Sequence, residues 1–277
     1  MRPGVAAALL LLAAVPALGQ TRPLQTEEAT TGAGGRIQFE TGAEAIANEP
    51  SYLTGRERAR WDGPLLRLIY SPAERVELDL EWVALVGASG EKGREDVSDG
   101  GDVTLRAKLR LFGGGAGKTT LGARFGVTLP ETSFNDVSFR PLGLGPNTIR
   151  AFAQALLTQP LGRARLHVNA GLLTFDEVYR AHEQRDFLLY GLALTLPLGR
   201  GLEGVAEVAG RLGEGTPGAE ERSEVRAGFR LGRGRVRGDV AVRRGLAPAD
   251  GTWGATAGLA WTIKASSSAL TTPVTVP

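Results

Sequence analysis

The sequence predicts an all-β protein, a transmembrane antiparallel up-and-down β-barrel of about twelve strands. Three observations predict this fold. Apolar and polar residues alternate with a period of two, the alternating segments are about twice as long as ordinary globular strands, and the connections between them are alternately long and short. The composition agrees, because 39 glycines and no cysteine provide for many tight turns and leave no disulfide to hold the fold.

The alternation is clearest between Asp102 and Leu111. Every odd-numbered residue there is Val, Leu or Ala, and every even-numbered residue is Asp, Thr, Arg or Lys. A strand places these two sets on opposite faces, whereas a helix would scatter the charges around its axis. Most of the alternating segments are long enough for a tilted strand to cross a bilayer. We expect strands near residues 36–46, 64–71, 75–86, 102–112, 118–129, 148–158, 163–174, 186–197, 201–212, 222–232, 235–246 and 252–264.

The connections support a membrane barrel independently. Outer-membrane barrels have short periplasmic turns and longer outer loops, so a chain that starts on the periplasmic side begins with a long link. This order holds through the tenth link, whereas the eleventh, residues 247–251, is only moderate in length. The links expected to be long are residues 47–63, 87–101, 130–147, 175–185 and 213–221.

The N-terminus predicts export. Arg2 precedes an apolar stretch from Val5 to Val15, and the small residues of Ala17-Leu18-Gly19 form a cleavage site, which is the pattern of a secretory signal peptide. A buried N-terminal helix is the alternative. The expected location is therefore the cell outer membrane. The expected divisions are a signal peptide (1–19), a flexible periplasmic N-terminal segment (20–35), the barrel (36–264) and a disordered C-terminal tail (265–277).

Charged side chains occupy the face that a barrel turns inward. Basic residues outnumber acidic ones on this face, and a basic lumen favours anions. The alternative, which we favour, is that Glu77–Glu81 lie opposite Arg106–Arg110 on the neighbouring strand, so that cross-strand ion pairs fill a narrow lumen. The expected lumen-lining residues are Arg67, Glu77, Asp79, Glu81, Arg106, Lys108, Arg110, Arg124, Arg150, Arg165, His167, Asn169, Glu207, Arg211, Arg226, Arg230, Arg237, Asp239 and Arg243.

Residues 113–120 read GGGAGKTT and look like a phosphate-binding loop. That motif needs a glycine where this chain has Phe112, and it needs a following helix where this chain continues as an alternating strand. We interpret the segment as a glycine-rich hairpin turn.

Other chemical motifs are weaker still. His167 and Asn169 share a strand face, but no serine is identifiably close, so a hydrolase site is less favoured than a polar lumen. The acidic residues around His182 and those between Asp96 and Asp102 lack metal-ligand spacing. Basic residues are dispersed and the formal net charge is only +2, which gives no nucleic-acid signal. We expect no catalytic residues, cofactor, metal or nucleic-acid partner.

About a quarter of the chain resembles a known family. Gly101-Asp102 opens one strand, Leu129-Pro130 closes another, and the stretch from Leu166 to Gly171 reads LHVNAG. These motifs are similar to those of the outer-membrane barrel family labelled as the phenol-degradation meta-pathway protein, or transporter. The resemblance implies an outer-membrane barrel associated with uptake of small hydrophobic molecules. The chain departs from the family's glycine-rich segment at Glu131–Pro146, which leaves the role of that loop open, and it continues past Trp261 instead of ending on an aromatic residue.

These observations lead to one main function hypothesis and two alternatives. The main hypothesis is a pore or transporter for small hydrophobic or anionic molecules. The first alternative is a plugged structural or adhesive barrel without transport, and the less favoured second is an outer-membrane hydrolase around His167. The expected partners are outer-membrane lipid, an unidentified small solute and, during insertion, the barrel-assembly machinery.

Overall fold

The computed structural model describes residues 22–90, 96–114, 117–132, 143–177 and 183–264. The expected signal peptide and C-terminal tail lie outside the described residues. No helix within these ranges has the length and apolar character needed to span a bilayer.

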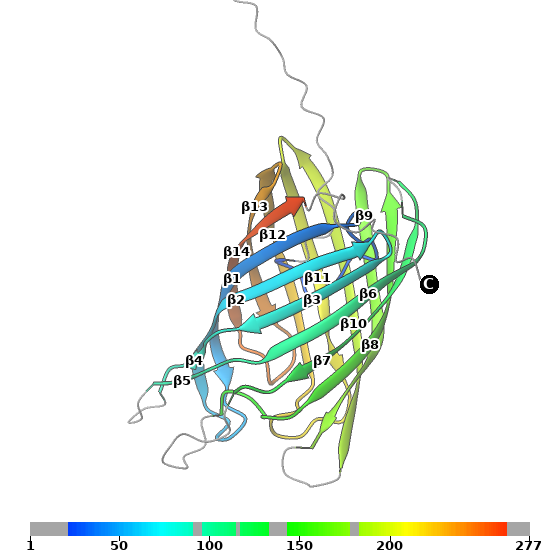
Figure 1. The fold of residues 1–277 in the computed structure, drawn as a ribbon. Helices are drawn as coiled ribbons and strands as arrows, with labels where there is room; N and C mark the ends of the chain where they lie inside the picture. Colours follow the sequence, from blue (N-terminus) through cyan, green and yellow to red (C-terminus); the bar gives the residue numbers. More distant parts are fainter. Residues whose placement is uncertain (1–21, 91–95, 115–116, 133–142, 178–182, 265–277) are drawn as a thin grey trace, which may run out of the picture.

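Twelve strands form a closed antiparallel ring, and two short strands extend it on one side (Figure 1). Each strand of the ring pairs with its neighbours, and β1 closes the ring by pairing with both β2 and β14. The strands are β1 (Arg36–Pro50), β2 (Glu57–Ala73), β3 (Val76–Val83), β4 (Val86–Ala88), β5 (Val97–Asp99), β6 (Val103–Phe112), β7 (Thr120–Leu129), β8 (Arg150–Leu161), β9 (Ala164–Asp176), β10 (Gln184–Gly199), β11 (Leu202–Leu212), β12 (Arg222–Arg233), β13 (Val236–Gly245) and β14 (Trp253–Lys264).

Burial alternates along each strand, and the polar residues are the buried ones, as in a membrane barrel. On β13, Asp239 is only 7% exposed whereas its neighbour Val240 is 51% exposed. On β6, Lys108 is buried and Leu105 is exposed. Ionised side chains therefore face the lumen and apolar ones face outward, which is the arrangement that hydrocarbon requires. The predicted all-β barrel is confirmed.

The structure adds strand pairing that the alternation does not predict. β2 begins at Glu57, within the link expected to cover residues 47–63. β5 lies within the link expected to cover 87–101, and β4 begins at Val86, the last residue of an expected strand, and continues into that link. β4 pairs with the added N-terminal part of β2, where Arg60 lies opposite Ala88. β4 and β5 have three residues each, too few to show a period of two.

The glycine-rich link between β6 and β7 is a turn. Gly113 and Gly114 have φ values of 76° and 103°, a region that residues with a side chain rarely adopt. The positive φ values of Gly113 and Gly114, between two paired strands, explain these two glycines without a phosphate-binding role.

The apolar outward face allows a prediction about stability. Val240 lies near the middle of β13, so Val240→Lys places a charge in hydrocarbon and is expected to lower the unfolding free energy by about 2–4 kcal/mol. The measurement is a urea titration of the barrel folded into lipid vesicles. Leu246→Lys, just beyond the end of β13, is the control and should cost about 0–1 kcal/mol. Equal costs at the two positions would contradict a membrane-facing belt at Val240.

A lumen closed by the N-terminal segment, with an outer vestibule

Residues 22–32, here called the inner segment, lie inside the barrel. Leu24, Glu27 and Ala29 are 6%, 2% and 0% exposed. This differs from the sequence expectation of a flexible periplasmic segment over residues 20–35. The physical reason is charge, because the inner segment carries carboxylates that an inward face rich in arginine binds.

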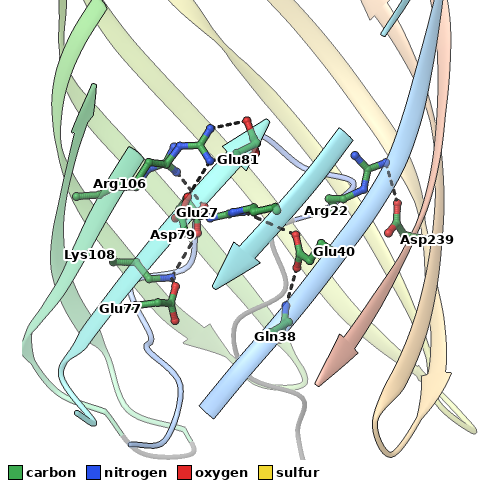
Figure 2. A network of polar contacts seen from close by, with 12 residues as sticks. Arg22, Glu27, Gln38, Glu40, Glu77, Asp79, Glu81, Arg106, Lys108 and Asp239 are labelled. Atoms are coloured by element: carbon green, nitrogen blue, oxygen red, sulfur yellow. Dashed lines mark hydrogen bonds and ion pairs between the residues drawn. The ribbon is translucent and has the colours of Figure 1, made fainter. Parts of the chain in front are cut away.

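Glu27 is the central anchor of the inner segment (Figure 2). Its carboxylate oxygens lie 2.9 Å from the guanidinium of Arg67, 2.9 Å from that of Arg124 and 3.4 Å from Nζ of Lys108. Asn169 reaches the backbone of the same residue, with its side-chain amide 3.0 Å from the Glu27 carbonyl and 2.8 Å from the Glu27 amide nitrogen. One acidic residue thus ties together β2, β6, β7 and β9.

Glu28 anchors the segment to a second part of the wall. It pairs with Arg165 at 3.2 Å and lies 4.0 Å from Nε2 of His167. The next backbone amide, that of Ala29, donates to Thr158 on β8 at 2.9 Å. The adjacent residues Glu27 and Glu28 therefore bind different parts of the barrel wall.

The start of the inner segment crosses to β11, β12 and β13. The backbone amides of Gln25 and Thr26 each donate to the Glu207 carboxylate at 2.8 Å. Arg226 donates to the Pro23 carbonyl at 2.8 Å, and Arg230 donates to the Arg22 carbonyl at 2.7 Å. The Arg22 guanidinium lies 3.6 Å from Asp239 on β13 (Figure 2). The inner segment thus spans the lumen from one wall to the other.

Glycines make room for the inner segment. A Cβ added at Gly191 on β10 would lie 2.6 Å from the Thr26 hydroxyl, and one added at Gly258 on β14 would lie 2.5 Å from Nε of Arg22. Distances this short are not compatible with normal packing. At these two positions the strands present backbone, without a side chain, to the inner segment.

Cross-strand ion pairs fill the wall beside Glu27, as the favoured interpretation of the lumen expected. Glu77 and Asp79 on β3 lie opposite Lys108 and Arg106 on β6. The Glu77–Lys108 and Asp79–Arg106 pairs measure 2.6 and 3.0 Å, and Arg106 also binds Glu81 at 2.7 Å (Figure 2). Asp79 in addition accepts a hydrogen bond from Arg67 at 2.8 Å.

None of the expected lumen-lining side chains is exposed, and the structure divides them into three groups. The group in contact with the inner segment consists of Arg67, Glu77, Lys108, Arg124, Arg165, His167, Asn169, Glu207, Arg226, Arg230 and Asp239. The group paired within the wall or at its rim consists of Asp79, Glu81, Arg106, Arg110, Arg237 and Arg243. Arg150 and Arg211 belong to the third group, at the outer end.

The outer end of the lumen holds a cavity of about 400 Å³, here called the outer vestibule. Tyr52, Thr132, Gly145 and Gly218 of the long links line it, so it lies at the end of the barrel opposite the short turns. Strand residues complete it. The charged strand residues are Arg60, Asp62, Glu81, Arg150, Arg211 and Arg222, and the links that lead into β6 and β12 add Asp102 and Glu220.

An apolar cluster supports one side of the outer vestibule. Phe175 on β9 and Phe187 on β10 stack with their ring centroids 5.4 Å apart, and Leu173 packs with them. All three point inward, against the rule that the inward face is polar. Arg211 covers this cluster, with its guanidinium carbon 5.5 Å from the Phe175 ring and 5.3 Å from the Phe187 ring.

His167 lies between two threonines. Its Nδ1 is 3.0 Å from the Thr158 hydroxyl and its Nε2 is 3.3 Å from the Thr195 hydroxyl. The third close group is Glu28 of the inner segment. These contacts place His167 within the packing of the inner segment. In the part of the chain that the structure describes, no group of three or more His, Asp or Glu residues is arranged to hold a metal ion.

Sequence reasoning missed the residues that close the lumen and several that form the outer vestibule. Glu27 and Glu28 were assigned to a flexible segment, and Arg60 and Arg222 were not assigned to the lumen. One signal was present in the sequence, since the expected lumen face carries more basic than acidic residues. An enclosed positive excess needs compensating carboxylates from elsewhere in the chain.

Comparison with known proteins agrees with the fold. The chain is similar to the crystal structure of an outer membrane channel from Pseudomonas putida F1, with a TM-score of 0.62, 18% identity, and coverage of 84% of this chain and 97% of that one. More distant similarities are to the translocator domain of the autotransporter NalP from Neisseria meningitidis (TM-score 0.48, 16% identity, 83% and 89% covered) and to the CymD monoaromatic hydrocarbon channel (TM-score 0.45, 10% identity, 84% and 93% covered). No protein-family model matches the chain, and no curated protein matches it. The fold is that of an outer-membrane β-barrel, which sets the location of the protein in the outer membrane.

The anchoring role of Glu27 can be tested by labelling. The chain has no cysteine, so Thr26→Cys gives a single reactive thiol at a site that is 3% exposed. In this background, Glu27→Gln removes the charge that three basic residues bind, and we expect a soluble maleimide to react at least about tenfold faster. The control is Glu74→Gln, because the Glu74 side chain is 80% exposed. Equal rates in the Glu27 and Glu74 variants would contradict the anchoring role.

Proposed function

We propose that this protein is an outer-membrane channel for small hydrophobic or anionic solutes, and that its inner segment closes the lumen. The observation that carries the proposal is that the lumen is crossed by a separate piece of chain rather than filled by strand side chains alone. The resemblance to the phenol-degradation meta-pathway family supports the same function. We propose membership of that family, with no enzymatic role for the barrel.

The contacts of the inner segment support closure that can be reversed. Within the described residues, the segment is joined to the barrel wall through residues 33–35, which lead into β1. Apart from the packing of Leu24, its attachments are mainly hydrogen bonds and ion pairs. Several go to side chains that also have partners in the wall, as Lys108 has in Glu77 and Arg67 has in Asp79. Departure of the segment would therefore leave the barrel ladder intact and leave much of the wall charge paired.

A second candidate is a permanently plugged structural or adhesive barrel. The number of strands that bind the inner segment favours it, since Glu27 alone contacts β2, β6 and β7. Under this alternative the outer links carry the function and no solute passes.

Planar-bilayer conductance separates the two candidates. For a channel, we expect the native chain to open intermittently, Glu27→Gln to open more often, and deletion of residues 22–32 to give a larger and steadier conductance, because each change removes obstruction from the lumen. Arg163→Gln, at an exposed residue beside a short turn, is the matched control and should behave as the native chain.

Two results would count against transport. Conductance restricted to the deletion variant would favour the structural alternative, because the inner segment would then be a fixed part of the fold. No conductance in any correctly folded variant would overturn the channel proposal.

A further inference from the structure

Arg211 differs from the other arginines of the outer vestibule. Each of the other three pairs with a carboxylate: Arg60 with Asp62 at 3.0 Å, Arg222 with Glu49 at 2.8 Å, and Arg150 with Asp102. No carboxylate of the described residues lies within ion-pair distance of the Arg211 guanidinium. A guanidinium that no carboxylate contacts directly, in a partly enclosed cavity, is a candidate for binding an anionic ligand.

The structure holds the Arg211 guanidinium in a fixed plane. Its Nε donates to the backbone carbonyl of Glu220 at 2.7 Å, and its guanidinium carbon lies over the rings of Phe175 and Phe187. Among the described residues, its two terminal nitrogens have no hydrogen-bond partner. Guanidinium nitrogens fixed in this way form a fork that matches the two oxygens of a carboxylate.

The acidic residues of the outer vestibule are already engaged. Asp62 and Asp102 bind the arginines named above, and Glu81 binds Arg106 at 2.7 Å. The Glu220 carboxylate accepts a hydrogen bond from the Gly218 amide at 2.7 Å. Among the described residues, none of these carboxylates lies within ion-pair distance of Arg211, so its guanidinium can take a carboxylate from outside the chain.

The rest of the outer vestibule provides an apolar wall. Val83, Val86, Leu144 and Leu173 line it together with Tyr52. Leu144 packs with Val86, and Leu173 packs with the phenylalanines beneath Arg211, so the wall is held in place from behind. A cavity of about 400 Å³ lies within the usual size range of small-molecule sites.

We propose that the outer vestibule binds a small organic monocarboxylate, with its two oxygens on the terminal nitrogens of Arg211 and its apolar body against Leu144, Leu173 and Val86. This inference rests on the proposed channel function and names the class of solute that the channel would take up. Recognition at the outer end would precede any movement of the inner segment.

Equilibrium binding to the full chain, folded in detergent micelles, tests the site. Calorimetric titration uses benzoate as the probe, benzamide as its uncharged counterpart of the same shape, and acetate as a carboxylate without an apolar body. We expect benzoate to bind more tightly than either. Arg211→Gln should weaken benzoate binding by about ten- to a hundredfold, the usual effect of losing a charge-assisted pair.

Two further variants keep the test decisive. Arg211→Lys keeps the charge but loses the planar fork, and it should bind benzoate with intermediate affinity. Arg163→Gln, outside the vestibule, should bind as the native chain does. Folding of every variant is checked by the shift in gel mobility that folded barrels show before heating.

The outcomes separate the site from the channel. Equal affinity for benzoate and benzamide, or unchanged benzoate binding in Arg211→Gln, overturns the site whether or not the barrel conducts. Benzoate binding that depends on Arg211 in a barrel that never conducts supports the site and overturns only the channel.

Discussion

In a closed β-sheet surrounded by hydrocarbon, ionised side chains must face the lumen. This constraint determines the rest of the structure. Inside a narrow barrel each charge needs a partner, because an unpaired one carries the full cost of leaving water. Neighbouring strands supply part of the pairing, as Asp79 and Arg106 show. The inner segment supplies much of the remainder through Glu27 and Glu28. The closure of the lumen is thus a direct consequence of the basic excess on its wall.

The outer vestibule exists because the inner segment binds elsewhere along the lumen. Its contacts run from Asp239 and Glu207 to Arg67 and Arg165, whereas residues of the long links line the vestibule. Without carboxylates from the inner segment, this end of the lumen relies on pairs within the wall and on an apolar cluster around Phe187. The two ends of one lumen therefore have different chemistry, a charge-neutralised closure and a partly apolar cavity.

Period-two alternation was enough to predict the barrel and its inward face, because both depend only on the residues of each strand. The alternation on β6 and the cross-strand pairing of Glu77 with Lys108 are examples. The inner segment could not be recognised in this way. Its residues show no period, and its partners lie far away in the sequence, as Gln25 and Glu207 do. The alternation of β9 also places Phe175 on the inward face of His167 and Asn169, but no local pattern encodes the contact that Phe175 and Phe187 make with Arg211.

The chemistry of the closure bears on whether it can open. A plug of apolar side chains would be held by the hydrophobic effect, and its release would expose apolar surface at a cost of about 25 cal/mol per Å². The inner segment is held mainly by ion pairs and by hydrogen bonds to its backbone, such as those from Arg226 and Arg230. Water can replace such contacts, so the net contribution of a hydrogen bond to a charged group is only about 1.5–3 kcal/mol. Leu24 is an exception, because it packs against Ala193 and Val205. The polar character of these contacts therefore supports the proposed channel function, in which the inner segment leaves the lumen.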